Sequence, residues 1–386
     1  GIRDRSPSRG LGDVYKRQAI YDLEKVEYSQ VVAGIDTRLE VTISPEDHTE
    51  VRRLTLVNLT SAPRELEVTS YAEIVLMAAE AEAAHPAFAN LFIETEYVDQ
   101  HATLLASRRP RSDNAKRIYA AHTLAVRGFT IGEIEYESSR LAFLGRGRTH
   151  ARPVALEYPL SGTTGAVLDP IFSMRRRIRV APGSSATIIF STAIANDRED
   201  ALSIAERYRD PVVAARAFEM AWTQSRVELR HMNISADDAH RFQRLISLSL
   251  YPDRVRRAAA EQLERNTSGQ SSLWAYGISG DYPIILARMQ SDDLGLLREL
   301  IQALEYWRLK GLMIDLVLLN DDASSYRQER QDQLLSMVRS SPVSRWLNER
   351  GGIFILRRDL LTDAVSYTHL RAHETDSYLV CRLLLE

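Results

Sequence analysis

The hydrophobic periodicity of this 386-residue chain changes once, near Asp197, and no single-class fold accommodates both patterns. From Glu27 to about Ala195, apolar and polar residues alternate in short runs separated by turn-forming residues. That alternation is typical of β-strands, and several short strands with few helical windows favour a β-sandwich. Beyond Asp197 the apolar residues recur at helical spacing, which predicts that helices follow the sandwich.

Two paired runs of alternating residues predict β-hairpins inside the strand-rich part. Residues 53–58 and 65–75 flank a turn-rich segment, and residues 177–190 alternate on either side of Pro182 and Gly183. A Pro-Gly pair is a strong turn signal. The Ala-rich segment 77–88 interrupts the pattern and predicts a helical or irregular excursion at an edge of the sandwich.

The part beyond Asp197 contains mainly helical patterns. Pro211 suits the first turn of a helix, and Ser235 with Asp238 resembles a capping box. The segments predicted to be helical are 197–208, 211–229, the segment that follows Ser235, a segment that begins at 283–289, 294–309 and 325–340. Two short apolar runs, 313–319 and 351–356, predict a buried strand and an extended segment.

Charge and hydropathy exclude several classes of protein. The net charge of −3 and the lack of a basic stripe argue against a nucleic-acid partner. The densest basic run, 175–177, lies in an alternating segment, and we interpret it as a solvated strand face. No run of about eighteen apolar residues and no signal-peptide pattern is visible, so we expect a cytoplasmic segment without membrane contact. Cys381 is the sole cysteine, which excludes an internal disulfide and a cysteine-based metal site.

Both ends of the chain differ from its interior. Residues 1–18 and 365–386 resemble translated sequencing-adapter read-through, and we expect both to be artefacts. The natural segment is then 19–364. His369 and His373 have a spacing that metal ligands use, but they lie in the second of these stretches, so no metal site is expected.

The segment 266–285 is the strongest candidate for a binding loop. It holds Trp274, Tyr276 and Asp281 among three glycines and a proline, a composition that no amphipathic helix or strand needs. An aromatic ring stacks on the apolar face of a sugar, and a carboxylate accepts hydrogen bonds from its hydroxyls. The pattern therefore favours sugar recognition, although loops rich in Trp and Gly also occur as plugs over a core.

Four further residues are weaker candidates for substrate binding. Asp315 lies inside an apolar run, so it is either paired or functional. His85 and Asn90 belong to a loop for which a plain surface role is the alternative. Arg146 lies in Gly145-Arg-Gly-Arg148, whose backbone N–H groups and guanidinium forks suit a phosphate or sugar, with a simple turn as the alternative.

Seven strings in a fixed order resemble one known family. They are Glu-Val-Thr-Ser-Tyr-Ala-Glu (67–73), the segment 84–96, Arg-Arg-Pro-Arg (108–111), Phe-Leu-Gly-Arg-Gly-Arg (143–148), Gly-Ala-Val-Leu-Asp-Pro-Ile-Phe (165–172), the segment 273–285 and Tyr-Trp-Arg-Leu-Lys-Gly-Leu (306–312). Together they resemble glycoside hydrolase family 94, in particular the phosphorylase-like C-terminal region of cyclic β-1,2-glucan synthases and the 1,2-β-oligoglucan phosphorylases.

The resemblance implies an α+β multidomain fold. It consists of a β super-sandwich related to galactose mutarotase over 19–196, a helical linker over 197–262 and a truncated (α/α)6 barrel over 263–364. The resemblance also implies a cytoplasmic location, with the cytoplasmic side of an inner-membrane synthase as an option for the parent protein. Homodimerisation of the parent is a further option.

The same resemblance implies an activity for the parent protein. Family members cleave a β-glucosidic bond with inorganic phosphate and invert the anomeric centre, and one carboxylic acid protonates the leaving oxygen. We therefore expect a fragment of a glycosyltransferase or phosphorylase that acts on β-1,2-glucan, with phosphate as co-substrate and no cofactor.

The expected roles of individual residues follow from the motif match. Asp281 resembles a sugar-binding position of the nonreducing-end subsite, and His85, Asn90 and Arg146 are expected near the mouth of the barrel. The general acid is expected downstream, so no catalytic residue is assigned and the fragment is expected to be inactive alone. The alternative is a noncatalytic module that binds the glucan or controls its chain length.

Overall fold

The computed structural model describes residues 17–110, 117–251, 269–289, 294–320, 327–360 and 384–385. It divides into two compact units, which we call unit 1 (Gly1–Arg226) and unit 2 (Val227–Glu386). Within the described ranges, no helix is long and apolar enough to cross a membrane.

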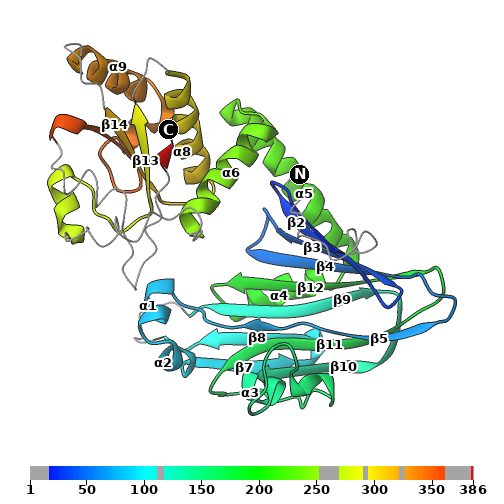
Figure 1. The fold of residues 1–386 in the computed structure, drawn as a ribbon. Helices are drawn as coiled ribbons and strands as arrows, with labels where there is room; N and C mark the ends of the chain where they lie inside the picture. Colours follow the sequence, from blue (N-terminus) through cyan, green and yellow to red (C-terminus); the bar gives the residue numbers. More distant parts are fainter. Residues whose placement is uncertain are drawn as a thin grey trace. The chain divides into compact units, whose positions relative to one another are not determined.

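The larger layer of unit 1 is an antiparallel sheet of eight strands, which we call the large sheet (Figure 1). Its strand order is β1-β2-β3-β4-β12-β9-β8-β7. The bounds are β1 Arg17–Tyr21, β2 Lys25–Val32, β3 Ile35–Ile43, β4 Thr49–Asn58, β7 Ile93–Val98, β8 Thr103–Arg108, β9 Tyr119–Arg127 and β12 Ser185–Ala195.

A second antiparallel sheet, the small sheet, packs against the large one. Its order is β10-β11-β5, with β6 also paired to β11. The bounds are β5 Arg64–Thr69, β6 Ala72–Glu73, β10 Phe129–Ser139 and β11 Pro170–Val180. The core between the sheets joins Leu104 and Ile188 of the large sheet with Phe172 and Ile178 of the small sheet, all nearly inaccessible to solvent. The sandwich expected from the sequence is confirmed.

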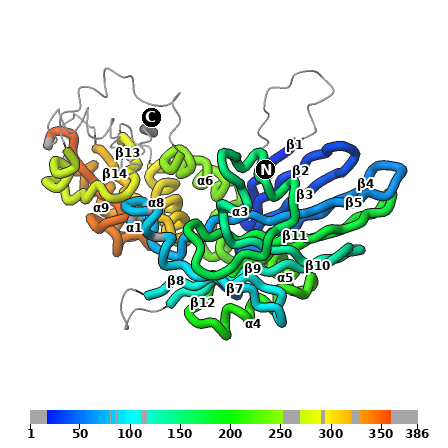
Figure 2. Tube along the Cα trace, turned by 90° about the horizontal axis from the view of Figure 1, so that it is seen from below, coloured from blue at the N-terminus to red at the C-terminus, as the bar shows by residue number. Residues whose placement is uncertain are grey.

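Helices cover the outer face of the large sheet. Ala201 and Ala205 of α4 (Arg198–Tyr208) pack on β8 and β9, and Phe218 of α5 (Pro211–Met232) lies beneath the guanidinium of Arg53 on β4, 4.2 Å from the ring centroid. Figure 2 shows α4 beside β12. The shorter helices of this unit are α1 Ala79–Ala84, α2 Pro86–Asn90, α3 Arg140–Leu144, η1 Asp99–His101 and η2 Val154–Leu156.

Both hairpins predicted from the sequence are wrong, because each turn carries the chain from one sheet to the other. The turn after β4 leads to β5, but β4 bonds to β3 and β12, whereas β5 bonds to β11. The Pro182-Gly183 turn likewise joins β11 of the small sheet to β12 of the large sheet. Alternation along a strand identifies the strand and its buried face, but it does not identify the hydrogen-bonding partner.

Asn58 ties these two crossings together. Its amide Nδ2 donates to the carbonyls of Ala62 at 2.8 Å and Val180 at 3.0 Å, one from each crossing. Its Oδ1 accepts from the backbone N–H and the hydroxyl of Thr60 at 3.0 and 2.7 Å. The side chain is fully buried, so these bonds satisfy groups that would otherwise lack a partner away from water.

A buried histidine lies between the two sheets. His122 Nε2 is 2.8 Å from Ser70 Oγ, and its Nδ1 is 2.9 Å from Thr192 Oγ1. The ring stacks between Phe172 and Phe190, with centroids 5.4 and 5.9 Å away. Burial among these groups lowers the pKa of His122 to about 3, so the ring is neutral across the physiological range.

The basic run 175–177 is only partly a solvated face. Arg177 is exposed and pairs with Glu67, but Arg175 is 4% exposed. The Arg175 guanidinium donates to the carbonyls of Ala155 and Tyr158, so it binds the segment that covers it. The prediction is therefore wrong for Arg175, since a strand pattern does not reveal which loop folds over its outer face.

Unit 2 contains a parallel sheet with the order β15-β14-β13-β16 (Figure 1). The strands are β13 Ile284–Met289, β14 Asp315–Asn320, β15 Ile353–Arg357 and β16 Leu384–Leu385. The helices are α6 Ala236–Leu250, α8 Leu294–Leu309, α9 Arg327–Arg339, η4 Gln270–Tyr276, η5 Pro342–Trp346 and η6 Arg358–Leu360. The described part of unit 2 therefore alternates strands and helices, which differs from the helical hairpins expected for the opening of an (α/α)6 barrel.

The helix predicted to begin at Pro283 is wrong, because residues 284–289 form β13. Ile284, Ile285, Leu286 and Ala287 are all buried, so both faces of this strand are covered. A parallel strand covered on both faces has a continuous apolar run, which periodicity cannot distinguish from a short buried helix. The strand predicted at 313–319 and the extended segment at 351–356 are confirmed by β14 and β15.

The other helical predictions agree with the structure. Asp197 caps α4 by accepting from the N–H of Asp200, and Pro211 opens α5. Ser235 and Asp238 form the expected capping box at the start of α6. The Ala-rich excursion forms α1 and α2. Residues 1–16 and 361–383, which include most of the two predicted artefacts with His369, His373 and Cys381, lie outside the described residues.

Replacing Asn58 with alanine is expected to lower the free energy of unfolding by about 2–4 kcal/mol, because several buried polar groups lose their partner at once. Urea denaturation followed by circular dichroism measures this change. Gln30→Ala, at an exposed position of β2, is the control and should stay within about 0.5 kcal/mol of the parent chain. Equal stability of both variants would contradict the role of Asn58.

His122 is expected to make the sandwich sensitive to acid. Its folded pKa lies below the unfolded value, so its contribution is complete above about pH 6.5 and is lost as the pH falls toward about 3. A pKa lowered from 6.5 to about 3 corresponds to a loss on the order of 5 kcal/mol. In His122→Gln this part of the pH dependence should be missing, whereas His48→Gln, an exposed site, should keep it. The same pH slope in all three proteins would show that His122 is not the titrating group.

Candidate functional site

The predicted binding loop folds onto the sheet of unit 2. Leu273 in η4 and Ile278 beyond it are buried in one cluster with Ile284 of β13 and Phe354 of β15. Tyr276 packs against the same cluster. The loop is thus partly a plug over the core, as the alternative interpretation expected, and Tyr276 belongs to that anchored part.

Trp274 is the part of the loop that faces solvent. It is 64% exposed, and its indole N–H donates to the carbonyl of Ser279 at 3.2 Å. Gln270 Nε2 donates to the same carbonyl at 2.8 Å and to Asp281 Oδ1 at 2.9 Å. Gly280 has a φ of +74°, and a Cβ there would lie 2.8 Å from Gln270 Cγ. These contacts fix the loop while the face of the indole remains accessible.

Asp281 forms an ion pair at the end of this loop. Its Oδ2 lies 2.7 Å from Arg350 Nη2, and the Arg350 guanidinium stacks over the ring of Tyr282, 5.0 Å from the centroid. Asp281 and Arg350 are both more than 40% exposed, so solvent screens the pair and its net stabilisation is small. The pair nevertheless holds a carboxylate and a guanidinium in defined positions on the surface.

Asp315 lies next to this pair but beneath the surface. It is the first residue of β14 and is 0% exposed. Its Oδ1 accepts from the N–H of Gly351 at 2.7 Å, and its Oδ2 has no hydrogen-bond partner among the described residues. Burial raises the pKa of Asp315 to about 6, with a smaller contribution from the negative charge of Asp281.

These side chains form a polar edge where the parallel strands begin. Asp315 pairs with Ile284 at the start of β13, and Gly351 and Gly352 lead directly into β15. In open α/β sheets, ligands usually bind at the carboxyl ends of the strands instead. Residues 290–293 and 321–326, which follow β13 and β14 in the sequence and include Asp321 and Asp322, lie outside the described residues.

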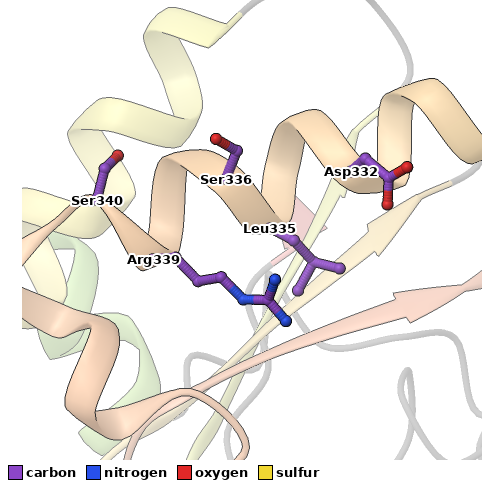
Figure 3. Close-up of a pocket in the computed structure, with 5 residues that line it drawn as sticks. All are labelled: Asp332, Leu335, Ser336, Arg339 and Ser340. Atoms are coloured by element: carbon purple, nitrogen blue, oxygen red, sulfur yellow. The ribbon is translucent and has the colours of Figure 1, made fainter.

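A hollow lies elsewhere on the surface of unit 2 and does not include the residues of the polar edge. Figure 3 shows its lining, which comes from α9 and the residue after it: Asp332, Leu335, Ser336, Arg339 and Ser340. A lining drawn from one helix offers no converging polar groups, and such convergence is the usual mark of a ligand site. Among the described residues, no group of three or more His, Cys, Asp or Glu side chains is placed to hold a metal ion.

The weaker candidates of the sandwich, His85, Asn90 and Arg146, belong to unit 1. His85 follows α1 and is exposed. Asn90, at the end of α2, donates to Asp169 Oδ1 at 3.1 Å. Arg146 is exposed on the turn after α3, where Arg148 makes a two-pronged contact with Glu157 at 2.6 and 3.0 Å. Because the Arg148 guanidinium is bonded to Glu157, this segment fits the alternative of a simple turn between strands.

Four of the predicted residues therefore share one region. Trp274, Tyr276, Asp281 and Asp315 all belong to the polar edge of unit 2 or to the loop beside it. The sequence reasoning missed Arg350, whose only signal was the Gly-Gly pair that follows it. That pair marks a close backbone approach, because a Cβ on Gly352 would lie 2.1 Å from the carbonyl oxygen of Trp346.

Comparison with known proteins gives a family and one curated relative. Residues 5–211 match the family described as "Glycosyl hydrolase 94, supersandwich domain". A protein named cyclic beta-(1,2)-glucan synthase NdvB, from Rhizobium meliloti (strain 1021), is 39% identical over 360 residues. The alignment covers 92% of this chain and 13% of that relative, so the chain spans a small part of the relative's length.

The solved structures resemble the chain only distantly. A bacterial glucoamylase complexed with acarbose has a TM-score of 0.34 and 9% identity, over 55% of this chain and 29% of that one. A putative kojibiose phosphorylase from human microbiome has a TM-score of 0.33 and 5% identity, over 54% and 24%. Likenesses at these scores carry no argument about fold or function.

Replacing Asp315 with asparagine is expected to stabilise the protein at neutral pH. The folded pKa of about 6 lies above the ordinary value of 3.8, so the cost of ionising this buried carboxyl appears as the pH rises from about 4 and is complete above about 6. Asparagine avoids that cost and can still accept from Gly351. The free energy of unfolding should rise by on the order of 3 kcal/mol at pH 7.5 and converge with the parent value near pH 4.

Asp332→Asn on the exposed side of α9 is the matched control and should show no such pH-dependent gain. Chemical denaturation across this pH range measures the difference. A loss of stability in Asp315→Asn at every pH would indicate that the ionised carboxylate is needed for the fold.

Proposed function

Because the chain belongs to the glycosyl hydrolase 94 supersandwich family, we propose that it is part of a glycosyltransferase or phosphorylase that acts on β-1,2-glucan. The similarity to a cyclic β-1,2-glucan synthase supports the glucan and its linkage. Since the chain spans 13% of that relative, the activity of the whole protein is part of the proposal. Inorganic phosphate is the proposed co-substrate of the parent protein.

The observation that carries the proposal is the fixed, exposed indole of Trp274. Its N–H already donates to Ser279, so the ring is positioned before any ligand binds. A ring that is held in place loses little conformational freedom when it stacks on a sugar, and its exposed face can contact the apolar face of a glucosyl unit. Tyr276 has a supporting role in this proposal, because it packs on the core beneath the loop.

Asp281 and Arg350 supply the polar contacts of the proposed subsite. The carboxylate accepts hydrogen bonds from sugar hydroxyls, and the guanidinium donates them. In the structure their ion pair places the two groups side by side. Asp315 is too deeply buried to contact a glucan, so its proposed role is to position the turn that carries Arg350 through the Gly351 N–H.

We assign no general acid to the described residues. The acid must deliver a proton to the glycosidic oxygen while phosphate attacks the opposite face. Asp281 is already ion-paired with Arg350 and accepts a hydrogen bond from Gln270, and Asp315 has no exposed surface, so we propose neither of them as the acid that protonates the glycosidic oxygen. We therefore propose that this chain recognises the sugar and that another part of the parent protein transfers the proton.

The same observation keeps a second candidate function open. A positioned indole beside an ion-paired carboxylate suits binding as well as it suits a substrate subsite. A noncatalytic module that binds glucan or controls its chain length needs only these sugar contacts and no catalytic acid. The two functions differ in the parent protein: a phosphorylase releases glucose 1-phosphate from β-1,2-glucooligosaccharides when phosphate is added, and a binding module does not.

Trp274→Ala is expected to weaken binding of a β-1,2-glucooligosaccharide by about 10-fold, which corresponds to the loss of one aromatic contact of roughly 1.4 kcal/mol. Isothermal titration calorimetry measures the affinity. The matched control is Trp222→Ala, which removes another exposed indole, 51% accessible, from α5. Unchanged affinity in Trp274→Ala, or an equal loss in both variants, would contradict the proposed site.

A further inference from the structure

A polar patch on unit 1 has no role in the proposed subsite. Four of its side chains come from well-separated segments: Glu73 from β6, Arg140 from α3, His150 from the segment that follows α3, and Asp169 from the residue before β11. Tyr71 joins them. The Tyr71 hydroxyl donates to Glu73 Oε1 at 2.8 Å, and Arg140 Nε donates to the same oxygen at 2.9 Å.

The contacts extend to both sides of this centre. His150 Nε2 lies 3.2 Å from the Tyr71 hydroxyl and 3.5 Å from Glu73 Oε1. On the other side, Arg140 Nη1 lies 3.9 Å from Asp169 Oδ2, and Asn90 binds the second oxygen of Asp169. We call the set Tyr71, Glu73, Asn90, Arg140, His150 and Asp169 the sandwich patch.

An apolar floor holds the sandwich patch in place. The Tyr71 ring packs against Phe143 with centroids 4.9 Å apart, and both belong to a cluster that also contains Ile171. His150 meets the Tyr71 ring edge-on at 5.2 Å. An exposed ion pair alone usually contributes little stability. The pair of Glu73 and Arg140 is bonded to Tyr71, which packs on a buried cluster, and side chains that contact a ligand need such support.

The charges of the patch restrict the ligand that it suits. Its two carboxylates outnumber its one guanidinium, so the patch is negative when His150 is neutral, which disfavours phosphate and other anions. The Tyr71 hydroxyl and then Arg140 hold the pKa of Glu73 below its usual range, so Glu73 remains an acceptor at neutral pH. Among the described residues no three metal-ligating side chains converge, which also disfavours a cation.

A neutral ligand rich in hydroxyls fits the remaining chemistry. Carboxylates and the amide oxygen of Asn90 accept from hydroxyls, and Arg140 and the Asn90 amide donate to them. The side chains of Glu73, His150 and Asp169 are 52%, 57% and 48% exposed, so their outer atoms are accessible to such a ligand. We propose that the sandwich patch is a second oligosaccharide-binding site, built from residues of unit 1 alone, that binds the same class of glucan. The choice of glucan rests on the proposed function.

The test counts binding sites by calorimetry on the full chain with a short β-1,2-glucooligosaccharide. The unsubstituted chain should bind two equivalents. Trp274→Ala should keep one of them at full affinity and bind the other about 10-fold more weakly. When Trp274→Ala is combined with Glu73→Gln, both sites should bind at least 10-fold more weakly. Asp169→Asn in place of Glu73→Gln should give the same loss. Inorganic phosphate, used as an anionic probe, should not bind at the patch.

The matched control is Glu67→Gln, which neutralises another exposed glutamate of the small sheet that pairs with an arginine, Arg177, at 2.7 Å. Thermal unfolding confirms that each variant remains folded. The second site would be overturned if the chain bound one equivalent, Trp274→Ala abolished that binding, and Glu73→Gln and Asp169→Asn both behaved like Glu67→Gln. The proposed function would remain intact in that case. Binding that Trp274→Ala leaves unchanged but Glu73→Gln reduces would support the patch and contradict the Trp274 subsite.

Discussion

The hydrogen bond from the Gly351 N–H to the buried carboxylate of Asp315 determines the geometry of the polar edge in unit 2. It fixes the turn that begins β15, and that turn places Arg350 against Asp281. Asp281 also accepts a hydrogen bond from the side-chain amide of Gln270. The same amide donates to the carbonyl of Ser279, which also accepts from the Trp274 indole. A continuous set of contacts thus runs from a buried acid to an exposed aromatic ring, and the ring's position depends on each of them.

Buried polar side chains also form hydrogen bonds inside the sandwich of unit 1. Asn58 satisfies backbone carbonyls from both chain crossings, and His122 links hydroxyls of the two sheets while it remains uncharged. Unpaired polar groups at these depths would cost more than the bonds themselves contribute. These residues therefore specify which strands face one another, which apolar packing alone does not do.

The sequence predicted the sandwich and most helices, because periodicity and caps such as Ser235 with Asp238 are local signals. It mispredicted the partners of β4, β5, β11 and β12, since strand pairing is a long-range property. It mistook β13 for a helix because both faces of that strand are buried.

The candidate site was predictable to a similar extent. Trp274 and Asp281 were recognisable from the composition of one loop, and the isolated Asp315 was recognisable from its apolar neighbours. Arg350 was not, because it lies far along the chain from the aspartate it pairs with. These residues lie close together because the parallel strands β13 and β14 begin at the same edge of the sheet. The sequence did not predict this proximity, because it predicted a helix where β13 lies.

The most direct test of the account follows each indole separately. The chain has four tryptophans, so labelling with 5-fluorotryptophan gives a fluorine NMR spectrum in which single substitutions assign every signal. On titration with a β-1,2-glucooligosaccharide, the Trp274 signal should shift in proportion to saturation, while the signal of the fully buried Trp307 should stay in place. A Trp274 signal that does not move while the glucan binds would contradict the claim that this indole is the sugar-contacting surface.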